Sequence, residues 1–222
     1  MNNVAWALLV AAAVVAIIDW IAVARRPSRV ETIAKPLVLV LLVVAAIVLD
    51  PVDGARRAWF VAALVLSLAG DVFLLPRPDK FVAGLASFLL AHLAYVAGFV
   101  AGGIVLAATP VAIVLVCLVG IPLGRRLVAG ARASGHADVV VPVIAYVAVI
   151  ALMVVAALAS GNRVAAVGAL SFMASDALIG WTRFVRPIAW APVGIMVTYH
   201  VAQVLLVVSL TVEAFKVTIP VG

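Results

Sequence analysis

Two aspartates inside apolar stretches of the sequence are the residues best placed to do chemistry. Asp176 lies within GALSFMASDALIG, residues 168–180, and Asp71 lies near the end of SLAGDVFLL, residues 67–75. A charged side chain at the centre of a bilayer costs about 2.5 to 3.5 kcal/mol, so a residue of this kind is a candidate for function. Either aspartate alone could instead pair helices by hydrogen-bonding to a neighbour.

A pair of carboxyl groups in a medium of low dielectric predicts acid catalysis. The two groups cannot both ionise easily, so one would hold a proton while the other is charged. Glycosidases use such a pair to protonate a leaving group and to stabilise an oxocarbenium-like state. Vinyl ethers also hydrolyse through an oxocarbenium ion, after protonation at carbon.

A histidine follows each aspartate on the next apolar stretch. His92 and Tyr95 are three residues apart and share one helix face, and Tyr199 and Gln203, beside His200, do the same at a spacing of four. These side chains could line a polar pocket that binds substrate. Buried histidines and tyrosines are also often core residues, and that interpretation stays open for each of them.

Four further residues, three of them polar and one a cysteine, need an interpretation. Lys35, before Pro36, could meet a phosphate headgroup as a point charge, or it could be an interfacial lysine. Tyr146 could line the cavity or simply pack. Asp19 is interpreted as an interfacial residue, and Cys117, inside an apolar stretch, as a buried packing residue.

Metal and cofactor chemistry is not predicted. The sequence has no HExxH motif and no close cluster of histidine and cysteine ligands. His92, His200, Asp71 and Asp176 could in principle meet in space, but nothing in their spacing requires a metal ion.

The composition predicts an integral membrane protein with an all-α fold. Of the 222 residues, 68% are hydrophobic and 11% are charged, which is more apolar surface than a soluble domain could cover. Eight stretches are long enough to cross a bilayer, so residues 1–222 form one transmembrane domain. The expected helices are Val4–Ala24, Ile33–Leu49, Ala58–Leu75, Phe81–Val100, Ile104–Leu123, Val139–Ala159, Val164–Phe184 and Ile188–Thr211.

The net positive charge of the chain does not predict a nucleic-acid partner, because the basic residues fall mostly between the apolar stretches. Their distribution instead predicts the orientation of the helices in the membrane. Eleven lie in or beside the odd-numbered connections and three in the even-numbered ones. Short cytoplasmic loops collect Lys and Arg, so we expect the odd connections to be cytoplasmic, with both termini outside, in a bacterial cytoplasmic membrane. The eleven are Arg25, Arg26, Arg29, Lys35, Arg77, Lys80, Arg125, Arg126, Arg132, Arg183 and Arg186, and the three are Arg56, Arg57 and Arg163.

The order of aspartate and histidine suggests an internal repeat. Residues 1–101 and 102–222 would each supply four helices, and an even number of helices gives both halves the same direction. The two halves would then surround a central cavity, with Asp71 and Asp176 at equivalent positions in the cytoplasmic half of the membrane.

At these residues the chain resembles the YhhN-like membrane family, whose characterised members are lysoplasmalogenases. The resemblance rests on six short motifs whose order and spacing cover about 170 residues. They are Lys35-Pro36, the S-x-x-G-D of residues 67–71, the A-H-x-x-Y of residues 91–95, Tyr146, the G-A-x-x-F-x-x-S-D of residues 168–176 and the Y-x-x-x-Q of residues 199–203.

The resemblance implies hydrolysis of the vinyl ether bond of lysoplasmalogens to a fatty aldehyde and a glycerophospho-alcohol, with Asp71 and Asp176 as the catalytic acids. Its partners would be the lysophospholipid substrate and membrane lipids, and the oligomeric state stays open. The main alternative is a small membrane transporter or lipid permease with a polar site at the midplane. A structural or partner-binding membrane protein would not need two matched buried acids.

Overall fold

The described part of the protein is a bundle of eight long α-helices. A computed structural model describes residues 2–25, 29–75, 80–135 and 137–213, and this part of the chain contains helices and no strand. The predicted all-α fold is confirmed. The helices are α1 (Asn3–Ala24), α2 (Arg29–Val48), α3 (Gly54–Phe73), α4 (Phe81–Ala101), α5 (Thr109–Ala133), α6 (Val140–Ala159), α7 (Arg163–Phe184) and α8 (Ala191–Val208), with short 3-10 turns at Leu106–Ala108, Ala137–Val139 and Ser209–Thr211.

Seven of the eight helices are long and apolar enough to cross a membrane. The protein is therefore a polytopic membrane protein. The exception is α3, which carries three charged residues, Arg56, Arg57 and Asp71. An eighth span through α3, and the internal repeat, stay predictions.

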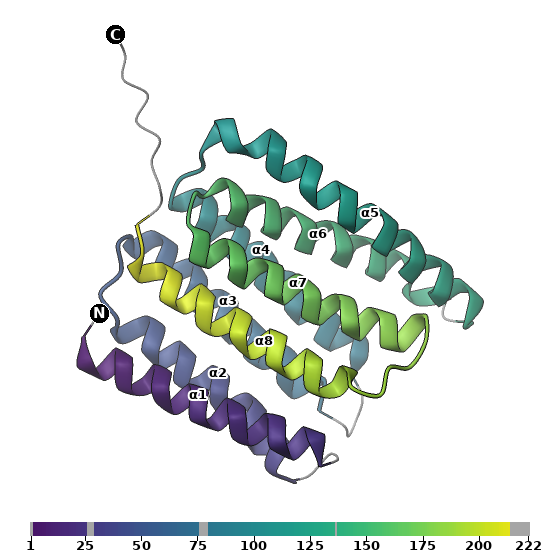
Figure 1. Ribbon diagram of the computed structural model, residues 1–222, viewed down its shortest axis with the longest axis horizontal. Coiled ribbons are helices and arrows are strands. Elements are labelled where there is room, and N and C mark those ends of the chain that lie inside the picture. The colour runs from purple at the N-terminus through teal and green to yellow at the C-terminus, as the bar shows by residue number, and fades with distance from the viewer. Residues whose placement is uncertain (1, 26–28, 76–79, 136, 214–222) are drawn as a thin grey trace.

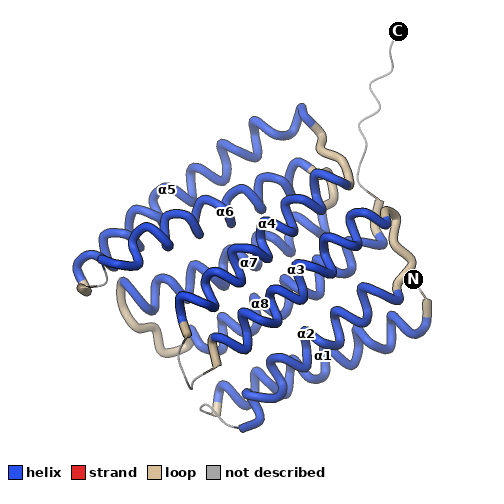
Figure 2. The backbone as a smooth tube through the Cα atoms, turned by 180° about the vertical axis from the view of Figure 1, so that it is seen from behind, coloured by secondary structure: helices blue, strands red, loops and turns tan. Residues whose placement is uncertain are grey.

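Helices that are consecutive in the chain pack in pairs. α1 lies against α2, α3 against α4, α5 against α6 and α7 against α8, and α8 also contacts α1, α2 and α3. Figure 1 shows α1 and α2 at one edge of the bundle and α5 at the other, and Figure 2 shows the same order from behind. Many of the fully buried residues are alanines, such as Ala45, Ala63 and Ala169, which lets these helices approach closely.

The odd-numbered helices begin at one end of the bundle, and three of them have the same kind of cap. The side chains of Asn2, Asp53 and Asn162 accept hydrogen bonds from backbone N–H groups in the first turns of α1, α3 and α7. The opposite end holds the C-terminal halves of these helices. Asp71 and Asp176 therefore both lie toward the same end of the bundle, as their positions in the sequence predicted.

The prediction for the fifth helix was wrong at both ends. A turn at Gly103, with φ of +98°, and the 3-10 turn delay its start to Thr109, and Pro110 occupies the first turn. The helix then continues through Pro122 and past Leu123 to Ala133, and it ends just before Gly135, which has φ of +81°.

Several basic residues assigned to connections therefore lie on helices. Arg125, Arg126 and Arg132 belong to α5, and Lys35 lies inside α2. Arg26 and Arg77 are outside the described residues.

The prediction for Cys117 was also wrong. Its side chain is exposed on the outer surface of α5, because this helix lies at the edge of the bundle and buries few of its residues.

Candidate active site

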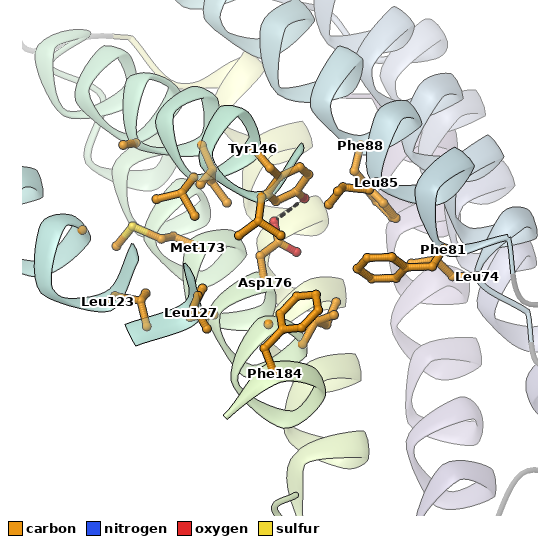
Figure 3. Close-up of a pocket in the computed structure, with 18 residues that line it drawn as sticks. Leu74, Phe81, Leu85, Phe88, Leu123, Leu127, Tyr146, Met173, Asp176 and Phe184 are labelled. Atoms are coloured by element: carbon orange, nitrogen blue, oxygen red, sulfur yellow. Dashed lines mark hydrogen bonds between the residues drawn. The ribbon is translucent and has the colours of Figure 1, made fainter. Parts of the chain in front are cut away.

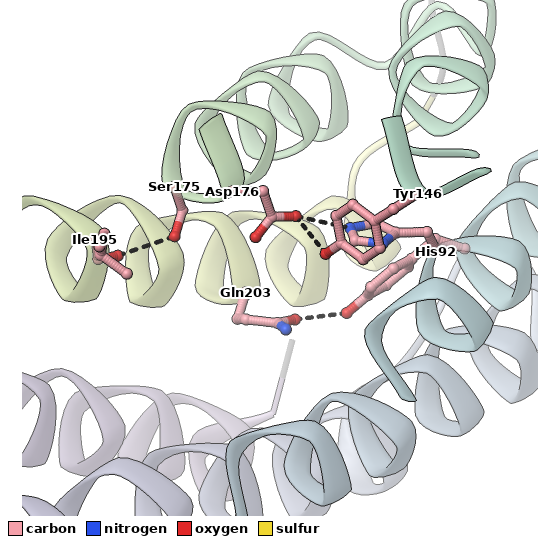
Figure 4. A network of polar contacts seen from close by, with 7 residues as sticks. His92, Tyr146, Ser175, Asp176, Ile195 and Gln203 are labelled. Atoms are coloured by element: carbon pink, nitrogen blue, oxygen red, sulfur yellow. Dashed lines mark hydrogen bonds and ion pairs between the residues drawn. The ribbon is translucent and has the colours of Figure 1, made fainter. Parts of the chain in front are cut away.

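Asp176 is held on α7 by contacts from two other helices. The Tyr146 hydroxyl of α6 donates a hydrogen bond of 2.7 Å to its Oδ2 atom, and His92 Nε2 of α4 lies 3.6 Å from the same oxygen. Figure 4 shows these three side chains converging, and Figure 3 shows the second carboxyl oxygen turned away from Tyr146. The Asp176 side chain keeps 11% of its surface exposed, whereas that of His92 is fully buried.

Asp71 is held near the end of α3 by a cation and a hydroxyl. Lys35 Nζ of α2 lies 3.2 Å from Oδ1, and the Tyr199 hydroxyl of α8 donates to Oδ2 at 2.8 Å. The Asp71 side chain is 1% exposed and that of Lys35 is 9% exposed. A buried carboxylate needs a partner of opposite charge, and Lys35 supplies it.

Aromatic rings separate the two acids. Phe172 is fully buried on α7, and its ring centroid lies 4.6 Å from that of His92 and 5.4 Å from that of Tyr199. His92 lies close to Asp176, and Tyr199 is hydrogen-bonded to Asp71. The two carboxyl groups therefore sit in separate polar clusters.

The other predicted site residues pair across α4, α8 and α1. The Tyr95 hydroxyl donates to Gln203 Oε1 at 2.6 Å, and Trp20 Nε1 donates to His200 Nδ1 at 3.0 Å. Figure 4 shows the bond to Gln203 beside the Asp176 cluster. The structure thus brings together Asp176, His92 and Tyr146 in one group and Lys35, Asp71 and Tyr199 in another.

The interpretation of Asp19 as an interfacial residue was wrong. It is fully buried in α1, and neither carboxyl oxygen has a hydrogen-bond partner among the described residues. Glu31, Lys35 and Asp71 are the charged residues near it. Asp19 interrupts an apolar stretch as Asp71 does, so there was the same reason to expect a buried acid. Its position near a predicted helix end favoured the interfacial interpretation instead.

An apolar cavity opens beside Asp176, between α4, α5, α6 and α7. Asp176 and Tyr146 are the polar side chains among its lining residues, and Asp71 and Lys35 do not line it. Figure 3 shows Met173 and Leu123 on one side of Asp176, and Phe81 and Phe184 on the other.

The sequence reasoning missed most of the cavity wall. Phe81, Phe88, Leu127 and Phe184 line it without any chemical signal of their own, because one apolar residue in a membrane helix looks like another. Phe172 did carry a signal, since it is the phenylalanine of the motif at residues 168–176.

The model of the YhhN family matches residues 30–210. The chain belongs to the YhhN family. The match includes both aspartate clusters, whereas Asp19 and Trp20 on α1 lie before it. No solved structure matches the chain significantly.

The curated relatives that the chain matches are all named lysoplasmalogenase. Lysoplasmalogenase TMEM86B of Homo sapiens is 35% identical over 159 residues, which is 71% of this chain and 65% of the human protein. The same-named protein of Sus scrofa is 33% identical over 84% of this chain and 77% of its own length. Lysoplasmalogenase of Mycobacterium tuberculosis is 34% identical over 76% of this chain and 66% of its own length. The chain thus spans about two thirds of the human and mycobacterial proteins.

Proposed function

We propose that this member of the YhhN family hydrolyses the vinyl ether bond of a lysoplasmalogen, with Asp176 as the acid. The observation that carries the proposal is that, among the described residues, Asp176 is the one carboxyl group lining the apolar cavity. The names of the curated relatives support the reaction, since each is a lysoplasmalogenase. The apolar wall suits an alkenyl chain, and the acid lies where the double bond of that chain would pass.

The acid begins the reaction by protonating carbon. A proton moves from Asp176 to the outer carbon of the double bond, and the electron pair of that bond forms the new C–H bond. The ether oxygen stabilises the resulting oxocarbenium ion. Water adds to the inner carbon and returns a proton to the Asp176 carboxylate, which gives a hemiacetal. The hemiacetal releases a fatty aldehyde, and its hydroxyl proton passes to the leaving oxygen of the glycerophospho-alcohol.

The contacts of the two acids distinguish their roles. Asp71 has the Lys35 ammonium against it and carries the negative charge, whereas the nitrogen group near Asp176 is the His92 imidazole. Tyr146 and His92 both face Oδ2 of Asp176, which leaves Oδ1 to carry the proton toward substrate. Asp71 then acts indirectly, through its charge and through Tyr199.

The remaining predicted site residues are buried in the bundle and are not among the residues that line the cavity. Tyr95 and Gln203 bond to each other on the inner side of α4 and α8, and His200 is oriented by Trp20. They would act on the site indirectly, through the packing of α4 and α8.

We further propose that α3 is the eighth span. It lies between α2 and α4, and Lys35 neutralises its buried carboxyl. The odd connections would be cytoplasmic in a bacterial inner membrane, as the basic residues predict. The repeat gains support from the contacts, because Asp71 meets α2 and α8 while Asp176 meets the corresponding α6 and α4. Reporter fusions in the odd and even connections would test this topology.

The function is tested by reconstituting the protein in vesicles and measuring aldehyde release from a lysoplasmalogen. Wild-type protein should release aldehyde, and Asp176→Asn should not. Asp138→Asn changes an exposed aspartate outside the cavity and should retain full activity. An Asp176→Asn variant that keeps full activity would disprove the mechanism. Vesicles that take up the lipid without cleaving it would favour the transporter.

A further inference from the structure

His92 on α4 is a histidine whose two ring nitrogens have no hydrogen-bond partner among the described residues. Its side chain is fully buried, and its Nε2 atom lies 3.6 Å from Asp176 Oδ2. That separation is longer than the distance of about 2.7 to 3.2 Å in an N–H···O hydrogen bond. Buried polar groups are nearly always hydrogen-bonded, so an imidazole in this state needs an explanation.

Two aromatic rings hold the imidazole in this position. The ring centroid of Phe172 lies 4.6 Å from that of His92 at an interplanar angle of 68°, and that of Tyr146 lies 5.4 Å away at 87°. Both contacts are edge-to-face, which is a favourable geometry for aromatic rings. Figure 4 shows the imidazole beside the Tyr146 ring, close to Asp176. A ring that turned away from Asp176 would lose these contacts.

The oxygen that faces His92 can accept a second hydrogen bond. A carboxyl oxygen has two lone pairs, and the Tyr146 hydroxyl uses one of those on Asp176 Oδ2 at 2.7 Å. Tyr146 reaches this oxygen from α6, and His92 reaches it from α4. A shift of about 0.7 Å would bring His92 Nε2 to the usual N–H···O distance of about 2.9 Å. The oxygen therefore has places for two donors, and one of them is occupied.

The charge on Asp176 determines how strongly this oxygen attracts the second donor. While Asp176 holds its proton on Oδ1, Oδ2 is a neutral carbonyl oxygen. Once the proton has moved to the substrate carbon, both oxygens share a negative charge, and hydrogen bonds to them become shorter and roughly twice as strong. An interaction that strengthens as charge develops lowers the barrier, whereas one that is equally strong in the resting enzyme does not.

We propose that His92 is a positioning residue that donates a hydrogen bond from Nε2 to Asp176 Oδ2 as the carboxylate forms. The inference rests on the proposed function, and it gives the carboxylate a second donor beside Tyr146. The imidazole stays neutral, with its hydrogen on Nε2. No proton leaves His92, because Asp176 gives up its own proton and recovers one from the water that adds. His92 does not line the cavity, so it acts on the substrate through Asp176.

The first test removes the donor and keeps the ring. His92→Phe retains an aromatic ring between Phe172 and Tyr146 but has no N–H group. It should lower kcat for a lysoplasmalogen about 10- to 100-fold, as expected for one hydrogen bond to a charged group, with little change in KM. His92→Gln carries an amide N–H close to the place of Nε2 and should recover part of the loss. A role in packing alone would give the opposite order, because glutamine replaces a ring less well than phenylalanine does.

Ser87 provides the matched control on the same helix. Its side chain is buried, donates to the Leu66 carbonyl at 2.7 Å and does not line the cavity. Ser87→Ala therefore removes a buried hydrogen bond from α4 and should leave kcat unchanged. Equal kcat in wild type and His92→Phe, or equal losses in His92→Phe and Ser87→Ala, would overturn the role of His92.

Binding of two unreactive analogues separates this inference from the proposed function. One is a saturated ether lysophospholipid, and the other has a protonated secondary amine in place of the ether oxygen, so that it carries the charge of the oxocarbenium ion. Wild-type protein should bind the amine more tightly, and His92→Phe should reduce this preference about 10-fold. If wild-type protein cleaves no vinyl ether but the preference depends on His92, the function fails and the role of His92 stands. If cleavage is normal and neither kcat nor the preference depends on His92, the role of His92 fails and the function stands.

Discussion

The Asp71 and Asp176 clusters have the same parts and different surroundings. In each, a tyrosine hydroxyl donates to Oδ2 of the aspartate at 2.7 to 2.8 Å, and a nitrogen group from another helix lies close to the carboxyl group. Asp71 has an ammonium group and no access to the cavity. Asp176 has an imidazole and lines the cavity.

This difference teaches that one motif can serve two purposes. A carboxylate closed off with a lysine is part of the framework, because removing either partner leaves a buried charge. A carboxyl group that keeps one oxygen directed away from its partners is available to a substrate. The clusters can therefore be told apart by whether a substitution changes stability or chemistry.

The largest effect is expected from Asp176→Asn. Loss of the general acid should lower kcat by about 10²- to 10⁴-fold. The free energy of unfolding should change little, since the amide can still accept the hydrogen bond from Tyr146. Aldehyde release and thermal unfolding in the same detergent would check both. A large loss of stability would make Asp176 a framework residue like Asp71.

Breaking the buried ion pair should act mainly on stability. Asp71→Asn or Lys35→Met should each lower the free energy of unfolding by about 3 to 5 kcal/mol, because the remaining charge is buried without its partner. The double substitution Lys35→Met with Asp71→Leu should cost less than the sum of the single ones. Thermal unfolding of the full set gives the coupling energy. Strict additivity would contradict a stabilising pair.

Substitutions of the two tyrosines should show the same contrast between stability and catalysis, with smaller effects. Tyr199→Phe leaves Asp71 with one hydrogen bond fewer in a fully buried place, and should lower the free energy of unfolding by about 1 to 3 kcal/mol. Tyr146→Phe removes the equivalent bond beside the cavity, and should change kcat more than stability. Equal stability losses in both variants would remove the distinction between the clusters.

The smallest effect is expected from the cavity wall. Gly120 of α5 lines the cavity, and a Cβ atom there would meet nothing within 4 Å. Gly120→Leu should fold normally and raise KM a few-fold for long alkenyl chains more than for short ones, since it takes up space that the chain would fill. A series of chain lengths measures this. Leu118→Ala changes an exposed residue on the same helix. It is the control and should change KM for neither the long nor the short alkenyl chains.

The sequence was sufficient to predict most of the helices and to place the two aspartates toward the same end of the bundle, but not to predict the partners of the aspartates. Long apolar stretches limited by charged residues and glycines predict membrane helices well. The predicted helix ends differed most from the observed ones at α5, which continues through Arg125 and Arg126. A helix that is apolar on nearly all sides gives no sign of which face meets which neighbour. The sequence could therefore not show that Lys35 pairs with Asp71, that Phe172 separates the acids, or that Asp19 is buried.

The edge position of α5 makes its surface thiol useful for spectroscopy. Cys117 is the single cysteine of the chain and is exposed three residues before Gly120 in the cavity wall. A nitroxide or fluorophore attached there would occupy a unique position facing the acyl chains, without any engineered cysteine. Its signal would report how α5 responds when a lipid enters beside it.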